Sequence, residues 1–145
     1  MGEIIRQDTE YAMRALVHLA VNGEEKQIAA KELAKSRNVP EDFMYKILHK
    51  LTRVGLTTCR LGYHGGFKLA RSPREITLLQ VVAAIQGPIT VKKCCLDLEV
   101  CPERSVCEFL PKLMELQNSL TTSLDGVTLA DVIKHEHLNE EEENK

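Results

Sequence analysis

The sequence predicts a mainly helical fold with one small β-hairpin, and three observations indicate it. Apolar side chains recur every three or four residues in several separate segments, the spacing of half-buried helices. Two short runs of strand-forming residues flank a glycine-rich tip at residues 60–66. Positive charge is concentrated around those two runs, although the chain as a whole has a net charge of −2.

The first predicted helix spans residues 8–21. Asp8 or Thr9 is positioned to cap its start, and Asn22 with Gly23 is expected to end it. Its apolar stripe consists of Ala12, Ala15, Leu16, Leu19 and Ala20.

A second, short helix is predicted from about residue 29 to residue 36, with Ile28, Leu33 and Ala34 facing inward. After a tight turn at residues 37–39, a third helix opens at Pro40. Acidic residues follow in its first turn, where their negative charge interacts favourably with the positive end of the helix dipole. Its buried stripe is predicted to be Met44, Ile47, Leu48 and Leu51.

Gly55 is expected to end the third helix, and two strands are predicted at residues 56–59 and 67–69. Two short helices, a tight turn and a basic hairpin are together typical of a winged helix-turn-helix. A capping box of Thr77 and Gln80 starts a fourth helix, which Gly87 and Pro88 break.

The remaining chain predicts a cysteine loop, a long helix and a last short helix at residues 128–135, with Thr128 and Asp131 in capping positions. The long helix either begins near Leu110 or is kinked at Pro111. Its apolar side chains form one seam, typical of a helix that packs along a partner, so a homodimer is expected. The seam consists of Phe109, Leu113, Leu116, Leu120 and Leu124.

Four regions follow from this order of elements. Residues 1–88 are expected to form the winged helix-turn-helix domain, and residues 89–108 a cysteine-rich loop that binds a cluster. Residues 109–135 are expected to supply the dimerisation helix and the short C-terminal helix, and residues 136–145 an acidic, flexible tail.

The charge distribution points to nucleic acid as a partner. From residue 43 to residue 74 there is no Asp or Glu, while seven Lys and Arg lie in the same stretch. No segment is apolar for long enough to cross a membrane, and the N-terminal residues do not form a signal peptide. A cytoplasmic protein that binds double-stranded promoter DNA is therefore expected, without a membrane partner.

The outer face of the third helix and the hairpin supply the candidate DNA contacts. Tyr45 and Lys46 are expected at base edges, and Arg60 and His64 in the minor groove or at its rim. The full predicted set is Tyr45, Lys46, His49, Lys50, Arg53, Arg60, His64, Lys68 and Arg71. The alternative is a solvated basic face that serves protein contacts.

Four of the five cysteines lie within fourteen residues, with the spacing Cys95-x5-Cys101-x5-Cys107 and with Cys94 beside the first. Thiolates are soft ligands that select iron–sulfur clusters, zinc or copper(I), and five-residue gaps fit zinc poorly. The adjacent Lys92 and Lys93 are expected to favour thiolates. The spacing alone does not separate a cluster from a thiol redox switch.

Several segments, taken in order, resemble the IscR/NsrR family of bacterial winged-helix regulators over about residues 5–135. They include residues 10–14 (Glu-Tyr-Ala-Met-Arg), 31–34 (Lys-Glu-Leu-Ala), 65–70 (Gly-Gly-Phe-Lys-Leu-Ala), 75–78 (Glu-Ile-Thr-Leu) and 128–132 (Thr-Leu-Ala-Asp-Val). The resemblance implies a homodimer whose long helices cross and in which Cys95, Cys101 and Cys107 ligate the cluster.

The resemblance also bears on the fourth ligand. Glu10 occupies the position of an acidic ligand that the partner subunit supplies in the nitric-oxide-sensing branch, with Cys94 or Asp8 as weaker choices. Two histidine ligands used in other branches are missing, because Leu110 and Arg37 stand at or near those points. This ligand set favours a [4Fe–4S] cluster over [2Fe–2S].

The predicted function is a DNA-binding transcriptional regulator, a repressor, that senses nitric oxide, redox state or iron–sulfur status. The main alternative is a cluster-free regulator with a cysteine thiol switch or a metal response. An enzyme is not expected, since the sequence shows no nucleophile–base pair and no phosphate loop. No small-molecule substrate is expected either.

Overall fold

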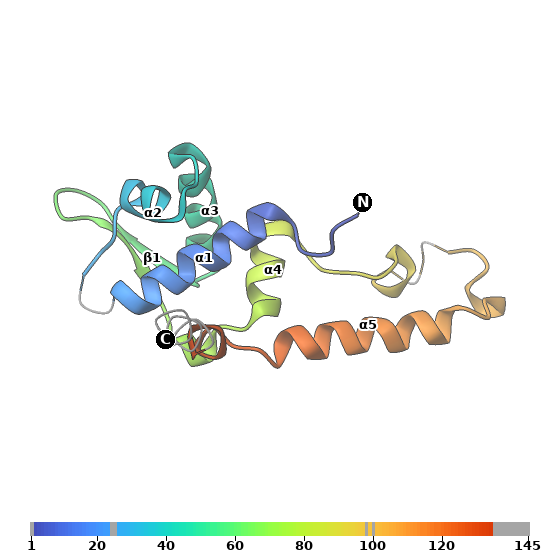
Figure 1. Ribbon diagram of the computed structural model, residues 1–145. Coiled ribbons are helices and arrows are strands. Elements are labelled where there is room, and N and C mark those ends of the chain that lie inside the picture. Colours follow the sequence, from blue (N-terminus) through green and yellow to red (C-terminus); the bar gives the residue numbers. More distant parts are fainter. Residues whose placement is uncertain (1, 24–25, 98, 100, 135–145) are drawn as a thin grey trace.

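The computed structural model describes residues 2–23, 26–97, 99 and 101–134 (Figure 1). It is mainly helical with one antiparallel pair of strands, as the sequence predicts. The helices are α1 (Gln7–Asn22), α2 (Ala30–Arg37), α3 (Glu41–Arg53), α4 (Leu78–Gln86) and α5 (Leu110–Asp125), and the strands are β1 (Thr57–Arg60) and β2 (Gly66–Leu69). Three short 3-10 turns are η1 (Pro73–Glu75), η2 (Lys93–Cys95) and η3 (Arg104–Val106).

Helix α1 lies between two apolar clusters and contributes to both. One cluster joins α1 to α3 and α4 through residues such as Leu16, Ile47 and Ile85. The other joins α1 to α2, α3 and the hairpin through residues such as Leu19 and Phe67. The predicted stripe of α3 is confirmed, since Met44, Ile47, Leu48 and Leu51 are all buried.

The hairpin of β1 and β2 runs from the pair Thr57–Leu69 to the pair Arg60–Gly66. A third segment joins it at Ile28, whose N–H donates to the Phe67 carbonyl at 2.9 Å and whose carbonyl accepts from the Phe67 N–H at 2.8 Å. The sequence placed Ile28 on the inward side of α2. Ile28 is buried as expected, but it lies before α2 and pairs with β2 through an isolated bridge.

The predicted cap of α1 is wrong. The N-cap residue is Arg6, and no side chain caps it. Asp8 lies inside the first turn and pairs with Arg6, whose guanidinium holds the pKa of the Asp8 carboxyl below its usual range. The side chain of Gln86, from the end of α4, fixes this start instead: its Oε1 accepts from the Arg6 N–H at 3.1 Å and from Thr9 Oγ1 at 2.8 Å.

The capping box at the start of α4 is confirmed. Gln80 N–H donates to Thr77 Oγ1 at 3.3 Å, and Thr77 N–H donates to Gln80 Oε1 at 3.2 Å. Thr77 also pairs with Thr128 in an isolated bridge that brings the C-terminal segment back to α4.

Residues 129–134 are helical, and Leu129 is buried in the cluster of α1, α3 and α4. Thr128 and Asp131 cap this segment reciprocally, as predicted. The predicted end of the helix at residue 135 and the acidic tail lie outside the described residues.

Helix α5 begins at Leu110, with Pro111 in its first turn, so the first of the two predicted alternatives is correct. Figure 1 shows α5 extending away from the other helices, with the cysteine segment at its far end. Phe109, just before the helix, is 75% exposed and Leu116 is 57% exposed, so the single chain leaves much of the apolar seam uncovered. Among the helices that the structure describes, none is both long and apolar enough to span a bilayer.

Gly66 is predicted to be essential for the hairpin. A Cβ there would lie 2.6 Å from both the carbonyl carbon and the oxygen of Ile28, and the φ of +147° is itself unfavourable for other residues. We expect Gly66→Ala to lower the free energy of unfolding by about 3–4 kcal/mol, measured by urea denaturation.

The matched control is Gly62→Ala at the tip of the same hairpin. Gly62 also has a positive φ, of +96°, but a Cβ there meets open space. The free energy of unfolding of Gly62→Ala should fall by about 1–2 kcal/mol, the cost of a left-handed backbone alone. Equal losses for the two variants would contradict the close approach of Gly66 to Ile28.

Candidate nucleic-acid interface and cysteine pocket

The outer face of α3 is joined to the hairpin by a cluster of aromatic rings. The Tyr45 and His49 ring centroids are 4.4 Å apart, and both rings meet Phe67 of β2 edge-on, at 6.3 and 5.9 Å. Phe67 is buried, while Tyr45 and His49 remain exposed. The helix and the hairpin therefore present one continuous surface, to which Lys46 and Arg53 add exposed cations.

The hairpin carries three more of the predicted DNA contacts, namely Arg60, His64 and Lys68, all of them exposed. His64 lies at the tip with a φ of +63°, in the left-handed region. Arg60 and Lys68 lie in β1 and β2, so the paired strands hold their backbones in place. These residues form a basic edge beside the exposed face of α3.

Two predicted phosphate contacts are already bonded within the chain. Lys50 Nζ donates to the carbonyl of Ile85 in α4 at 3.2 Å, and Arg71 Nε donates to the carbonyl of Gly55 at 3.2 Å. The positive charge of Lys50 also contributes to the lowered pKa of the Asp8 carboxyl. Lys50 thus ties α3 to α4 rather than leaving its ammonium group free on the outer face. Long-range bonds of this kind leave no signal in a helical pattern.

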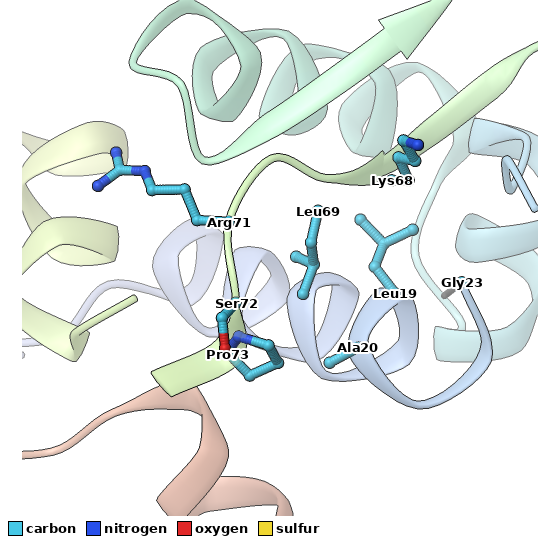
Figure 2. A pocket seen from close by; sticks show the side chains of 8 residues that line it. All are labelled: Leu19, Ala20, Gly23, Lys68, Leu69, Arg71, Ser72 and Pro73. Atoms are coloured by element: carbon cyan, nitrogen blue, oxygen red, sulfur yellow. The ribbon is translucent and has the colours of Figure 1, made fainter. Parts of the chain in front are cut away.

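A hollow of about 460 Å³ lies between the end of α1 and the segment after β2 (Figure 2). Leu19, Ala20, Leu69 and Pro73 line it with apolar atoms. Lys68 and Arg71 are its cations, but Figure 2 shows their side chains extending in different directions. Because the two charges do not converge, we assign no anion site to this hollow.

The cysteine segment surrounds a cavity of about 710 Å³ at the start of α5. Cys101 and Cys107, both predicted ligands, line it together with Cys94. Cys95, the third predicted ligand, is only 8% exposed and is not among the lining residues. Lys92, Lys93, Phe109 and Leu113 complete the wall.

The arrangement does not form a ready site for a single metal ion. Within the described part of the chain, no three His, Cys, Asp or Glu side chains lie close enough together for one. Desolvation raises the pKa of the Cys94 thiol, and the neighbouring Cys95 raises it further, while Lys92 acts in the opposite direction without reversing the shift. Lys92 therefore favours the Cys94 thiolate, as predicted, but desolvation and Cys95 outweigh its effect on the pKa.

Gln117 holds the start of the cysteine segment onto α5. Its Oε1 accepts from the Val91 N–H at 2.8 Å, and its Nε2 donates to the Ile89 carbonyl at 3.0 Å. Gln117 is the only residue of α5 that is buried. Sequence reasoning missed this role, and the available signal was a polar residue beside the apolar seam of a helix.

The two acidic candidates for the fourth ligand lie on α1. Glu10 is exposed and pairs with Arg14 one turn later, and it does not line the cysteine cavity of its own chain. Asp8 is half-buried and pairs with Arg6. Of the two carboxylates, Glu10 is the more open to a second molecule.

Residues 5–135 match the family model described as Rrf2, iron-dependent transcriptional regulator. The chain belongs to the Rrf2 family. Protein aau3 of Rhizobium meliloti is 35% identical over 131 residues, which cover 90% of this chain and 84% of that protein. Rrf2 proteins are transcriptional regulators and not enzymes, which confirms the prediction that the chain is not an enzyme. The family match also confirms the resemblance to the IscR/NsrR regulators.

Solved structures confirm the predicted fold class. The structure of CymR, the global cysteine regulator of Bacillus subtilis, has a TM-score of 0.75 at 22% identity, covering 93% of this chain and 98% of that one. IscR of T. potens has a TM-score of 0.72 at 23% identity, covering 93% of this chain and 89% of that one. The chain thus has the winged-helix fold of these regulators.

The bonds of Gln117 generate a testable prediction. Gln117→Ala leaves the Val91 N–H and the Ile89 carbonyl without their partner, so the free energy of unfolding should fall by about 2–4 kcal/mol. The Val91 amide should also exchange its hydrogen faster. Asn118→Ala, at the exposed neighbour, is the control and should change neither quantity. Unchanged protection of the Val91 amide from hydrogen exchange in the Gln117 variant would contradict the proposed role of Gln117.

Proposed function

We propose that this Rrf2 regulator is a DNA-binding repressor that senses nitric oxide, redox state or iron–sulfur status through a cluster in the cysteine cavity. One observation carries the proposal: Cys94, Cys101 and Cys107 surround one largely apolar cavity at the end of a helix whose apolar seam is uncovered.

The residues of the cavity fit a cluster better than a single ion. In a [4Fe–4S] cluster each thiolate binds a different iron, so the ligand sulfurs lie further apart than the four ligands of one tetrahedral zinc. The lysines in the wall offset part of the negative charge of several thiolates. A bound cluster would supply iron atoms that nitric oxide or oxygen modifies.

We infer that Cys101 and Cys107 are ligands and that the adjacent pair of Cys94 and Cys95 supplies the third. The five-residue spacing selects Cys95, whereas the cavity presents Cys94. A [4Fe–4S] cluster is favoured, with [2Fe–2S] as the alternative. The side chain that faces the cavity in the loaded protein decides between the two cysteines.

Glu10 of the partner subunit is the proposed fourth ligand. Its surface ion pair with Arg14 is the kind that contributes little to stability, so the carboxylate is readily exchanged to another partner. Asp8 is less suited because Arg6 and the Thr9 N–H already bond to its carboxylate. This ligation requires the homodimer, in which the uncovered seams of two α5 helices would pack on each other.

For DNA, the proposal places α3 in the major groove with Tyr45, Lys46 and His49 toward base edges. Arg53, Arg60, His64, Lys68 and Arg71 would contact the backbone or the minor groove. Two copies related by a two-fold axis would then read a promoter site with two similar halves.

Hydrogen bonds on either side of Gly87 and Pro88, joined by the backbone of residues 86–89, offer a route from the cysteine segment to α3. Gln117 bonds Ile89 and Val91, just before the cysteines, and Gln86 bonds the start of α1. The neighbouring Ile85 carbonyl accepts from Lys50 of α3. A displacement of residues 89–91 would therefore reach both the helix that carries Glu10 and the recognition helix.

A thiol switch without a cluster is the second candidate. The Cys94 and Cys95 side chains interact directly, and Cys101 also acts on Cys94. An external oxidant that joined two of these thiols in a disulfide would reshape the same cavity. Mass spectrometry of the denatured protein after mild oxidation distinguishes this candidate, since it would show a disulfide within residues 94–107.

The cluster is tested by the absorption spectrum and iron content of protein purified without oxygen. We expect a broad band near ~400 nm and about four iron atoms per chain. Cys101→Ser and Cys107→Ser should lose both. Of the adjacent variants Cys94→Ser and Cys95→Ser, one should lose both signals and the other should keep them.

Cys59→Ser, in β1 and outside the cavity, is the control and should keep the full signal. A colourless wild-type protein that resists reconstitution with iron and sulfide would contradict the cluster. It would leave the family assignment intact and favour the thiol switch.

A further inference from the structure

The tip of the hairpin carries two large apolar side chains that the described residues do not cover. Leu61 is 84% exposed and Tyr63 is 92% exposed. The Tyr63 ring lies against His64, with centroids 4.2 Å apart. Figure 1 shows the loop between the strands projecting beyond the body of the molecule. Burial within their own chain therefore contributes little to the stability of either side chain.

The backbone of the tip is held in one shape by its glycines. The Gly65 N–H donates to the Gly62 carbonyl at 2.9 Å, and a Cβ at Gly65 would lie 2.2 Å from the Arg60 carbonyl oxygen. Gly62 and His64 both have positive φ. Leu61 and Tyr63 are therefore presented on a closed turn, which lowers the entropy that a ligand would have to remove.

The charges around the tip indicate which partner it fits. Arg60 and His64 flank the two apolar residues, and Lys68 follows in β2. No acidic residue lies between residues 43 and 74. Proteins that bend DNA combine cations of this kind with an apolar wedge that enters the minor groove and partly unstacks a base step.

The position of the hairpin relative to α3 agrees with this partner. Phe67 in β2 contacts Tyr45 and His49 of α3, and the Arg60–Gly66 pair closes the ladder just before the tip. When α3 lies in the major groove, the tip is held beside the same segment of duplex. An apolar wedge there would bind more tightly to sequences whose base steps deform at low energetic cost.

We propose that Leu61 and Tyr63 form an apolar wedge that enters the DNA minor groove beside each half-site and selects deformable base steps. The proposal rests on the proposed DNA-binding function, because it requires that α3 and the hairpin dock on duplex DNA. It adds two residues that supply shape-dependent specificity rather than charge.

The test uses the full-length protein and a duplex that the wild-type protein selects from a random-sequence library. The double variant Leu61→Ser with Tyr63→Ser should bind that duplex roughly tenfold to a hundredfold more weakly. Burying two large apolar side chains would contribute more than this, but the cost of unstacking a base step offsets part of it. The dependence of the variant's affinity on salt should stay unchanged. Arg60→Ser should instead reduce the slope of log affinity against log salt concentration by about the contribution of one phosphate contact.

A spectroscopic readout separates a wedge from simple contact. 2-Aminopurine placed at successive positions beside the half-site should brighten at one step when the wild-type protein binds, and this signal should vanish with the double variant. Val21→Ser, an exposed apolar residue at the end of α1, is the control and should leave affinity and fluorescence unchanged.

The outcomes distinguish the wedge from the underlying function. If wild-type protein selects no duplex even at low salt, the proposed DNA-binding function fails. If wild-type protein binds but the double variant matches it in affinity and fluorescence, the wedge alone is overturned. Loss of association between protein chains in the double variant, with DNA affinity retained, would overturn the wedge in favour of a protein contact.

Discussion

The proposed DNA-binding surface depends on the placement of Phe67. Its backbone pairs in both directions with Ile28, which fixes the entry to α2, and its ring meets Tyr45 and His49 of α3. One buried residue therefore joins the hairpin to α3 and to the segment before α2. Gly66 permits this contact, because its backbone passes too close to Ile28 for any side chain. In the proposed dimer, two such surfaces would be held at the spacing of two half-sites.

The cysteine segment is connected to this surface by two amide side chains, those of the buried Gln117 and the half-buried Gln86. Gln117 and Gln86 each make two or more bonds to backbone or side-chain groups from distant parts of the chain. Buried polar groups are costly unless their bonds are made, so each amide fixes the segment that it contacts. The same amides are the points through which a change in the cysteine cavity would reach α1, α4 and α3.

Much of the fold followed from local patterns. The stripe of α3, the capping box at Thr77 and the glycine-rich tip all depend on residues close in sequence, which is why they were predicted correctly. The cap of α1, the strand pairing of Ile28 and the bond of Lys50 depend on residues far apart in sequence, so no local pattern contains them. The cysteine spacing predicted one site, but which of two adjacent cysteines faces the cavity depends on how the loop folds. The proposed fourth ligand would come from a second chain.

The central claim is that the state of the cysteine cavity controls DNA affinity. The most direct test measures the dissociation constant for one duplex, at one salt concentration, with the same anaerobic preparation before and after its iron is removed. The account predicts a change of roughly tenfold or more, within the range of allosteric coupling. Equal affinities, with iron fully present in one sample and absent from the other, would contradict it.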